Sequence, residues 1–136
     1  MNYVLLQKKA EDRISACPVF WAFSDKQFGE GCKKLGVTEP KKELAGIGFG
    51  GFTLKADKDL WNKALEGNSK ERDEFLADMI NLKEAFRYEL GNHEYCITYD
   101  DQETWEAVGI DMDKSTPEQR KAFVEARDYY LRNCDY

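Results

Sequence analysis

The chain has 136 residues, of which 42% are hydrophobic and 34% charged, and a formal net charge of -6. A chain of this length is the size of one ordinary domain and can bury roughly 70% of its unfolded surface, and this composition excludes an intrinsically disordered protein. The first nine residues contain an apolar run of only three residues, too short for a signal peptide or a membrane span. We therefore expect a single globular domain over residues 1–136, in the cytoplasm and without membrane contact.

The first quarter of the chain predicts a helix, a strand and a second helix. Apolar residues recur every three or four positions from residue 3 to residue 14, and this helix must end before Pro18. Residues 18–23 form a short apolar run that is typical of a buried strand. Ser24 and Gln27 then predict a capping box, which opens a helix that ends at Gly36.

A glycine-rich segment over residues 44–54 predicts a second strand, after a loop at residues 38–43. Alternation would place Gly46, Gly48 and Gly50 on one face of this strand. Either another element packs very closely against that face, or the strand bends. The nucleotide-binding glycine motifs require a following helix or a Gly-Lys-Ser/Thr sequence, and neither is present.

The middle of the chain predicts mostly helix. Residues 56–66 form a short helix that Gly67 and Asn68 stop, and the apolar spacing from residue 69 to residue 90 predicts one long helix. Asn81 and Glu84 form a second potential capping box, so a break at Asn81 remains an alternative.

The last third predicts a strand and two helices. Residues 93–99 alternate as a half-buried strand, and Asp100 caps a helix that ends at Gly109. Ser115 or Thr116, followed by a proline, starts the final helix. Three strands among these helices allow a parallel α/β sheet or an α+β fold. We predict α+β, with a small three-stranded sheet packed against about five helices in a single domain.

Metal and cofactor motifs are incomplete, so we predict neither. The pair His93-Glu94 lacks the second histidine of a zinc-protease motif, because the chain has one histidine. The four cysteines are widely separated and predict free thiols.

Glu89, His93 and Glu94 are the candidates for catalysis. A helix-strand corner can bring carboxylates beside an imidazole that titrates near neutrality, as acid-base chemistry requires. The alternative is a structural polar corner, which is the commoner arrangement.

The acidity of the chain is concentrated in residues 94–113, which contain seven acids and no Lys or Arg, while the rest of the chain has a net charge of +1. A solvated surface is the ordinary interpretation, but uncompensated acids also favour a basic partner. Direct nucleic-acid binding is disfavoured, since acids separate the lysine pairs. The candidate partner-binding residues are Glu94, Asp100, Asp101, Glu103, Glu106, Asp111 and Asp113.

Residues 20–28, the glycine segment, and above all residues 87–96, which read Arg-Tyr-Glu-Leu-Gly-Asn-His-Glu-Tyr-Cys, resemble a family of short uncharacterised proteins encoded by phages, plasmids and integrated elements. The resemblance covers roughly residues 1–110. It implies a small accessory protein of a mobile element in a bacterial host cell, such as an inhibitor or modulator of a host or defence protein.

Three functions therefore stay open from the sequence. The first is a non-enzymatic module that binds a basic host protein through the acidic segment. The others are a small His/Glu enzyme and a homo-oligomeric accessory protein, which the 13% aromatic content permits.

Overall fold

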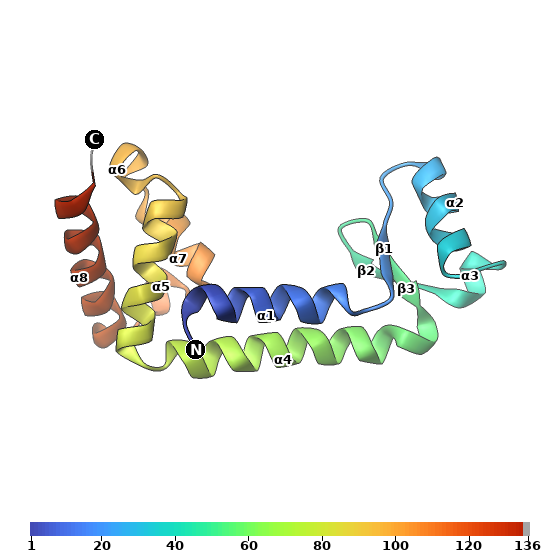
Figure 1. The fold of residues 1–136 in the computed structure, drawn as a ribbon, viewed down its shortest axis with the longest axis horizontal. Coiled ribbons are helices and arrows are strands. Elements are labelled where there is room, and N and C mark those ends of the chain that lie inside the picture. The colour runs from blue at the N-terminus through green and yellow to red at the C-terminus, as the bar shows by residue number, and fades with distance from the viewer. Residues whose placement is uncertain (135–136) are drawn as a thin grey trace. The chain divides into compact units, whose positions relative to one another are not determined.

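A computed structural model describes residues 1–134, and the chain divides into two compact units. Unit 1 comprises Met1–Leu6 and Glu71–Tyr136, and unit 2 comprises Gln7–Lys70. Helices and one small antiparallel sheet make the fold α+β, as predicted, although the described residues form eight α-helices rather than about five (Figure 1). The expectation of one domain over residues 1–136 stays a prediction.

The elements follow one another in this order. They are α1 (Tyr3–Ser15), β1 (Val19–Trp21), α2 (Asp25–Lys34), α3 (Pro40–Glu43), β2 (Leu44–Gly48), β3 (Gly51–Leu54), the 3-10 turn η1 (Lys55–Asp57), α4 (Lys58–Leu76), α5 (Met79–Asn92), α6 (Tyr95–Thr98), α7 (Asp101–Val108), the 3-10 turn η2 (Met112–Lys114) and α8 (Pro117–Asn133).

Unit 2 is built on the sheet, whose strand order is β1-β3-β2 with both pairs antiparallel. Adjacent strand residues point to opposite faces, so Phe20 joins one small core with Cys32 and Leu44. Val19, on the other face, packs against a second core that includes Trp61. The predicted cap of α2 is confirmed, because the Ser24 side chain accepts a hydrogen bond from the Gln27 backbone N–H.

The prediction of one strand over residues 44–54 is wrong, since the chain turns back between β2 and β3. Gly48, Phe49 and Gly50 all have positive φ at this turn, and the strand register shifts between Gly46 and Gly48. Nothing packs within 4 Å of where a Gly46 Cβ would lie, so that glycine is not a close-packing position. Residues 40–43, predicted as loop, form α3.

The helix boundaries predicted between residues 56 and 90 are also wrong. Helix α4 continues through Gly67 and Asn68, and it ends at Leu76. The break to α5 lies at Ala77 and Asp78, where the Asp78 side chain caps α5 by accepting from two backbone N–H groups. Asn81 lies inside α5, and its side chain donates to the Phe75 carbonyl instead of starting a helix.

The strand predicted at residues 93–99 is absent, because these residues leave α5 and form the short helix α6. Glu94 and Tyr99, on either side of α6, are left-handed, with φ of 52° each. The Glu94 carbonyl accepts from the Ile97 and Thr98 backbone N–H groups, so the hydrogen bonds are local. The alternation of aromatic and polar residues was therefore not the signature of a strand.

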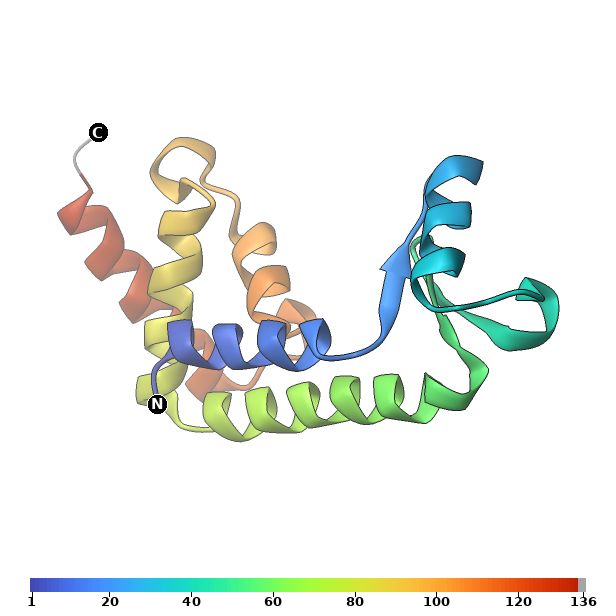
Figure 2. The same cartoon turned by 45° about the vertical axis from the view of Figure 1, so that its right-hand side comes forward.

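The core of unit 1 forms where α5 packs against α8 and α7 (Figures 1 and 2). Three aromatic rings lie at its centre: Phe86 is 4.7 Å from Trp105 and 5.2 Å from Phe123 between ring centroids. The buried members of this core are Tyr3, Leu6, Leu76, Leu82, Ala85, Phe86, Leu90, Tyr95, Trp105, Val108, Ala122, Phe123 and Ala126.

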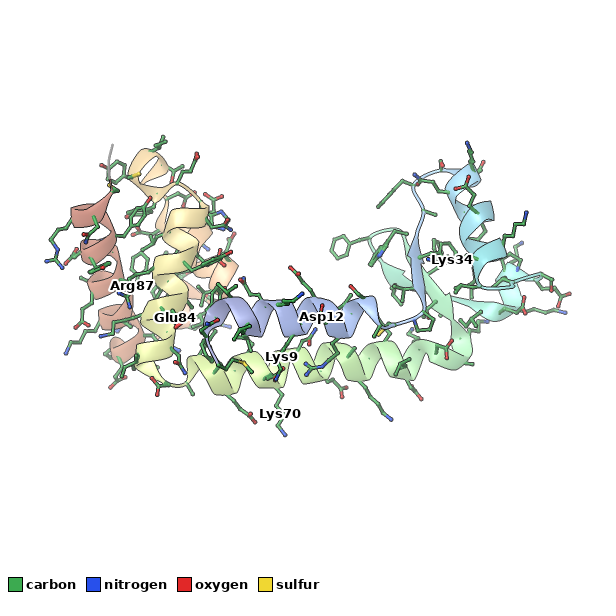
Figure 3. All side chains as sticks on the ribbon, viewed as in Figure 1. Lys9, Asp12, Lys34, Lys70, Glu84 and Arg87 are labelled. Atoms are coloured by element: carbon green, nitrogen blue, oxygen red, sulfur yellow. The ribbon has the colours of Figure 1, made fainter. Side chains whose placement is uncertain are left out.

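The first turn of α1 belongs to unit 1 and is anchored there by a carboxylate. The Tyr3 backbone N–H donates to Glu84 Oε1 at 2.7 Å, and Figure 3 shows Glu84 beside this turn. A carboxylate at the start of a helix satisfies an unpaired N–H and favours the helix dipole.

Candidate functional site

A row of two carboxylates and one imidazole joins the end of α5 to α7. His93 Nε2 lies 3.2 Å from Glu89 Oε2, and His93 Nδ1 lies 3.0 Å from Glu103 Oε1. Glu89 is one helical turn before His93, whereas Glu103 comes from the first turn of α7. We call these three side chains the histidine bridge.

Glu89 is the buried end of the bridge, with 3% of its surface exposed. Its Oε1 accepts a hydrogen bond from the Tyr3 hydroxyl at 2.9 Å, and the Asn92 side chain donates to Oε2 at 3.4 Å. Burial raises the pKa of the Tyr3 hydroxyl, and the hydrogen bond to Glu89 raises this pKa further. Tyr3 therefore stays a neutral donor, which a buried carboxylate needs.

The histidine bridge can fasten helices together, but it leaves the imidazole poorly placed for acid-base catalysis. Each ring nitrogen of His93 already faces a carboxylate, so a substrate proton would have to displace one of them. We interpret the bridge as a structural connection between α5 and α7.

The structure brings together two of the three predicted catalytic candidates. Glu89 and His93 are in contact, whereas Glu94 is exposed and, among the described residues, forms no hydrogen bond or ion pair with them. Glu103, which the sequence suggested only as a partner-binding acid, occupies the remaining ring nitrogen. To predict this histidine bridge, one must know that α7 folds back against α5, and the sequence did not show that.

Several of the seven partner-binding candidates have defined structural contacts. Asp100 caps α7, and Asp111 caps η2, each through a backbone N–H. Asp101 accepts a hydrogen bond from the Tyr95 hydroxyl, and Glu106 accepts one from the Gln102 side chain.

These acids form no close ion pair with a lysine or arginine of the described residues. Within the described part of the chain, no Lys or Arg side-chain nitrogen lies within 4.0 Å of a carboxylate oxygen of any of the seven. The basic side chain that does lie so close is His93, whose Nδ1 is 3.0 Å from Glu103 Oε1. Unit 1 as a whole contains 8 Lys or Arg and 17 Asp or Glu, a net charge of -9, against 12 and 9 in unit 2, a net charge of +3. The acidity of the protein therefore belongs to unit 1.

The seven acids do not form one continuous cluster. Glu94, Asp100 and Asp101 lie around α6 and the start of α7, whereas Asp111 and Asp113 follow the opposite end of α7. An eight-residue helix separates the two groups by about 12 Å along its axis.

Two large apolar side chains lie exposed among the acids around α6, which the sequence pattern did not indicate. Ile97 is 58% exposed and Tyr99 is 65% exposed. In a strand, alternation would place both on the same face as Tyr95, but in α6 only Tyr95 is buried. We define the α6–α7 surface as Glu94, Ile97, Tyr99, Asp100, Asp101, Glu103 and Glu106.

Among residues 1–134, no group of three or more His, Cys, Asp or Glu side chains is arranged to hold a metal ion. The four cysteines are free, two of them buried. None of the described helices combines the length and apolar character that crossing a membrane would need.

Comparison with known proteins places the chain in a family. No curated protein and no solved structure matches it. The sequence profile of a family of unknown function, DUF7659, matches residues 2–128 and so covers both units. The resemblance to an uncharacterised family is confirmed at this level, and the chain belongs to the DUF7659 family.

Proposed function

We propose that this protein is a small accessory protein of a mobile genetic element that binds a basic site on a host protein through its α6–α7 surface. The observation that carries the proposal is the exposure of Ile97 and Tyr99 among carboxylates that have no Lys or Arg side-chain nitrogen within 4.0 Å in residues 1–134. Interfaces commonly combine an apolar centre with a polar rim, and tyrosine is enriched in them.

The backbone around α6 supports a role for this surface. Glu94 and Tyr99 are neither glycine nor asparagine, yet both are left-handed. This conformation costs about 1–2 kcal/mol for an L-residue, and such strain is concentrated at binding and switch segments. Between these two residues Ile97 is exposed, and the exposed Tyr99 ring lies against the buried Tyr95, with 5.7 Å between ring centroids.

The histidine bridge supports the same interpretation, because it holds α7 to the end of α5 on one side of α6. Tyr95 gives a second anchor through its hydrogen bond to Asp101. A surface that is ordered before binding loses less conformational entropy when the partner arrives. The acids on it would also accelerate the approach of a basic partner.

The biological context comes from the resemblance to proteins of phages, plasmids and integrated elements. A protein of that kind would act in the cytoplasm of the bacterial host. An acidic surface could there occupy a basic site that normally holds nucleic acid, and so inhibit or modulate a host or defence protein.

The proposal is tested by pull-down from a host lysate with variants chosen for exposure. Ile97→Ser with Tyr99→Ser removes the apolar centre, and Glu94→Gln with Glu106→Gln removes two charges. Both pairs should release the partner, and the wild-type complex should weaken as salt screens the charges.

The matched control is Glu74→Gln with Asp128→Asn, which removes two exposed acids of unit 1 outside the surface. This control should keep the partner. Retention of the same partners by both surface variants, with no effect of salt, would contradict the proposal.

The two alternatives make different predictions. A His/Glu enzyme would lose a measurable activity on His93→Ala while staying folded, but the two occupied ring nitrogens do not favour it. A homo-oligomeric accessory protein would show a mass above 15.8 kDa by light scattering of the purified chain alone.

A further inference from the structure

A small basic pocket lies between α5 and α8 and shares no residue with the α6–α7 surface. It has a volume of about 190 Å³ and is lined by Lys83, Arg87, Glu125, Ala126, Tyr129 and Arg132. Figure 3 shows Arg87 on α5 where it faces α8. We call this the α5–α8 pocket. Three cations and one carboxylate give it a local charge of +2 inside a unit with a net charge of -9.

The carboxylate of the pocket is already occupied. Lys83 Nζ donates to Glu125 Oε2 at 3.0 Å, and Lys121 Nζ lies 3.9 Å from Glu125 Oε1. The hydrogen bond from Lys83 lowers the pKa of Glu125, which favours the ionised carboxylate. Glu125 therefore has little charge left to compensate a further cation.

The two arginines of the pocket form no ion pair with a carboxylate of residues 1–134. Among the described residues, no carboxylate oxygen lies within 4.0 Å of a side-chain nitrogen of Arg87 or Arg132. The Arg87 guanidinium lies over the Tyr129 ring, 4.9 Å from its centroid, which holds it in place by a cation–π contact. Like charges around one small cavity repel, and an anion would relieve that repulsion.

From this arrangement we infer that the α5–α8 pocket binds a phosphate monoester group, with Arg87 and Arg132 as its donors and Lys83 at its edge. A phosphate monoester has a charge of about -1.5 to -2 at pH 7, which matches the local charge of +2, whereas a carboxylate has -1. Guanidinium groups offer planar, paired donors that suit phosphate oxygens.

The size of the pocket limits the ligand to its phosphate end. Sites that enclose a drug-sized ligand measure about 300–1,000 Å³, and the α5–α8 pocket is smaller than that. The rest of a phosphorylated ligand would therefore extend over the exposed Tyr129. This site is independent of the proposed host partner.

Isothermal titration calorimetry on the full chain tests the inference, with potassium chloride keeping the ionic strength constant. The probes are inorganic phosphate, adenosine 5′-monophosphate, adenosine, and a single-stranded oligothymidylate without terminal phosphate. Inorganic phosphate and the monophosphate should bind, and adenosine should not. Arg87→Gln and Arg132→Gln should each weaken phosphate binding about tenfold, as expected for the loss of one charge-assisted hydrogen bond.

The matched control is Lys114→Gln, which removes one positive charge from unit 1 outside the pocket and should bind like the wild type. If Arg87→Gln fails to fold by circular dichroism, Arg132→Gln decides the question. The inference is overturned if phosphate does not bind, or if Lys114→Gln weakens binding as much as the arginine variants do. Tighter binding of the oligothymidylate than of the monophosphate would also overturn it, in favour of a nucleic-acid backbone site.

Discussion

The hydrogen bond between Tyr3 and Glu89 should be a major stabilising contact of unit 1, and a double-mutant cycle can measure it. Tyr3 and Glu89 are each 3% exposed, and their oxygens are 2.9 Å apart. A hydrogen bond to a charged group contributes about 1.5–3 kcal/mol. Tyr3→Phe should therefore lower the free energy of unfolding by about that amount, because the buried carboxylate loses a donor.

The same substitution should have a much smaller effect once Glu89 is gone. In a Glu89→Met background the Tyr3 hydroxyl has no carboxylate to bond, so Tyr3→Phe removes a buried hydroxyl that lacks this acceptor. We expect Tyr3→Phe to be neutral or stabilising there, and a coupling energy of at least about 1.5 kcal/mol from the cycle.

Urea unfolding of all four proteins at pH 7, followed by circular dichroism and tryptophan fluorescence, measures these energies. Tyr88→Phe is the matched control, since its ring packs 5.4 Å from that of Tyr3 but is 42% exposed. It should change stability by less than about 0.5 kcal/mol. An equal cost of Tyr3→Phe in both backgrounds would refute the reasoning.

Four further substitutions test the packing, the backbone and one buried hydroxyl in other parts of the chain. In α2, Gly29→Ala should raise the free energy of unfolding by about 1 kcal/mol through helix propensity, because nothing lies near its Cβ position. Gly31→Ala should lower it by about 1–3 kcal/mol, because the new Cβ would overlap the buried Phe20 ring. At the β2–β3 turn, Phe49→Gly should raise the free energy of unfolding by about 0.5–1 kcal/mol, since Phe49 is 95% exposed and left-handed, with φ of 50°. Equal urea midpoints for variant and wild type would contradict this. Burial, and then the hydrogen bond to Asp101, raise the pKa of Tyr95 to about 12 from the ordinary 10.0, so its contribution to stability is present below pH 10 and is lost as the pH rises through 12. Urea midpoints between pH 8 and 11.5 should fall less steeply in Tyr95→Phe than in the wild type.

The parts of the fold that the sequence predicted correctly depend on local signals. The starts of α2, α7 and α8 are each marked by a side chain that accepts a backbone N–H within three residues, and Gly36 and Gly109 have the left-handed conformation expected at helix ends. These interactions involve neighbours in sequence, so a pattern of a few residues is sufficient to identify them.

The wrong boundary in α4 shows how contacts between elements override such signals. Gly67 and Asn68 would stop an isolated helix, but in unit 2 the Asn68 side chain donates to the Ala10 carbonyl at 3.2 Å and accepts from Arg13 at 2.6 Å. With its polar group satisfied by α1, Asn68 has no need to cap a helix end. No pattern near residue 68 indicates that α1 lies beside it.

The sequence predicted two of the three residues of the histidine bridge and missed the third, for a similar reason. Glu89 and His93 are one helical turn apart, and their contact needed only the prediction that α5 reaches His93. Glu103 joins them because the chain reverses at Glu94 and Tyr99, and left-handed backbone at such residues has no sequence signature. The exposed positions of Ile97 and Tyr99 depend on the same reversal.

Residues 81–100, the densest motif of the chain, can now be separated by what each side chain contacts. Glu84 holds the first turn of α1, Glu89 holds the Tyr3 hydroxyl, and His93 and Tyr95 each connect to an acid of α7. These side chains hold the helices of unit 1 together, so substituting one of them first of all changes the stability of the unit. Ile97, in contrast, is exposed on a turn whose backbone is strained. The fold does not bury this side chain, and the backbone beside it costs free energy to hold. A role in binding therefore explains Ile97 better than a role in stabilising unit 1 does.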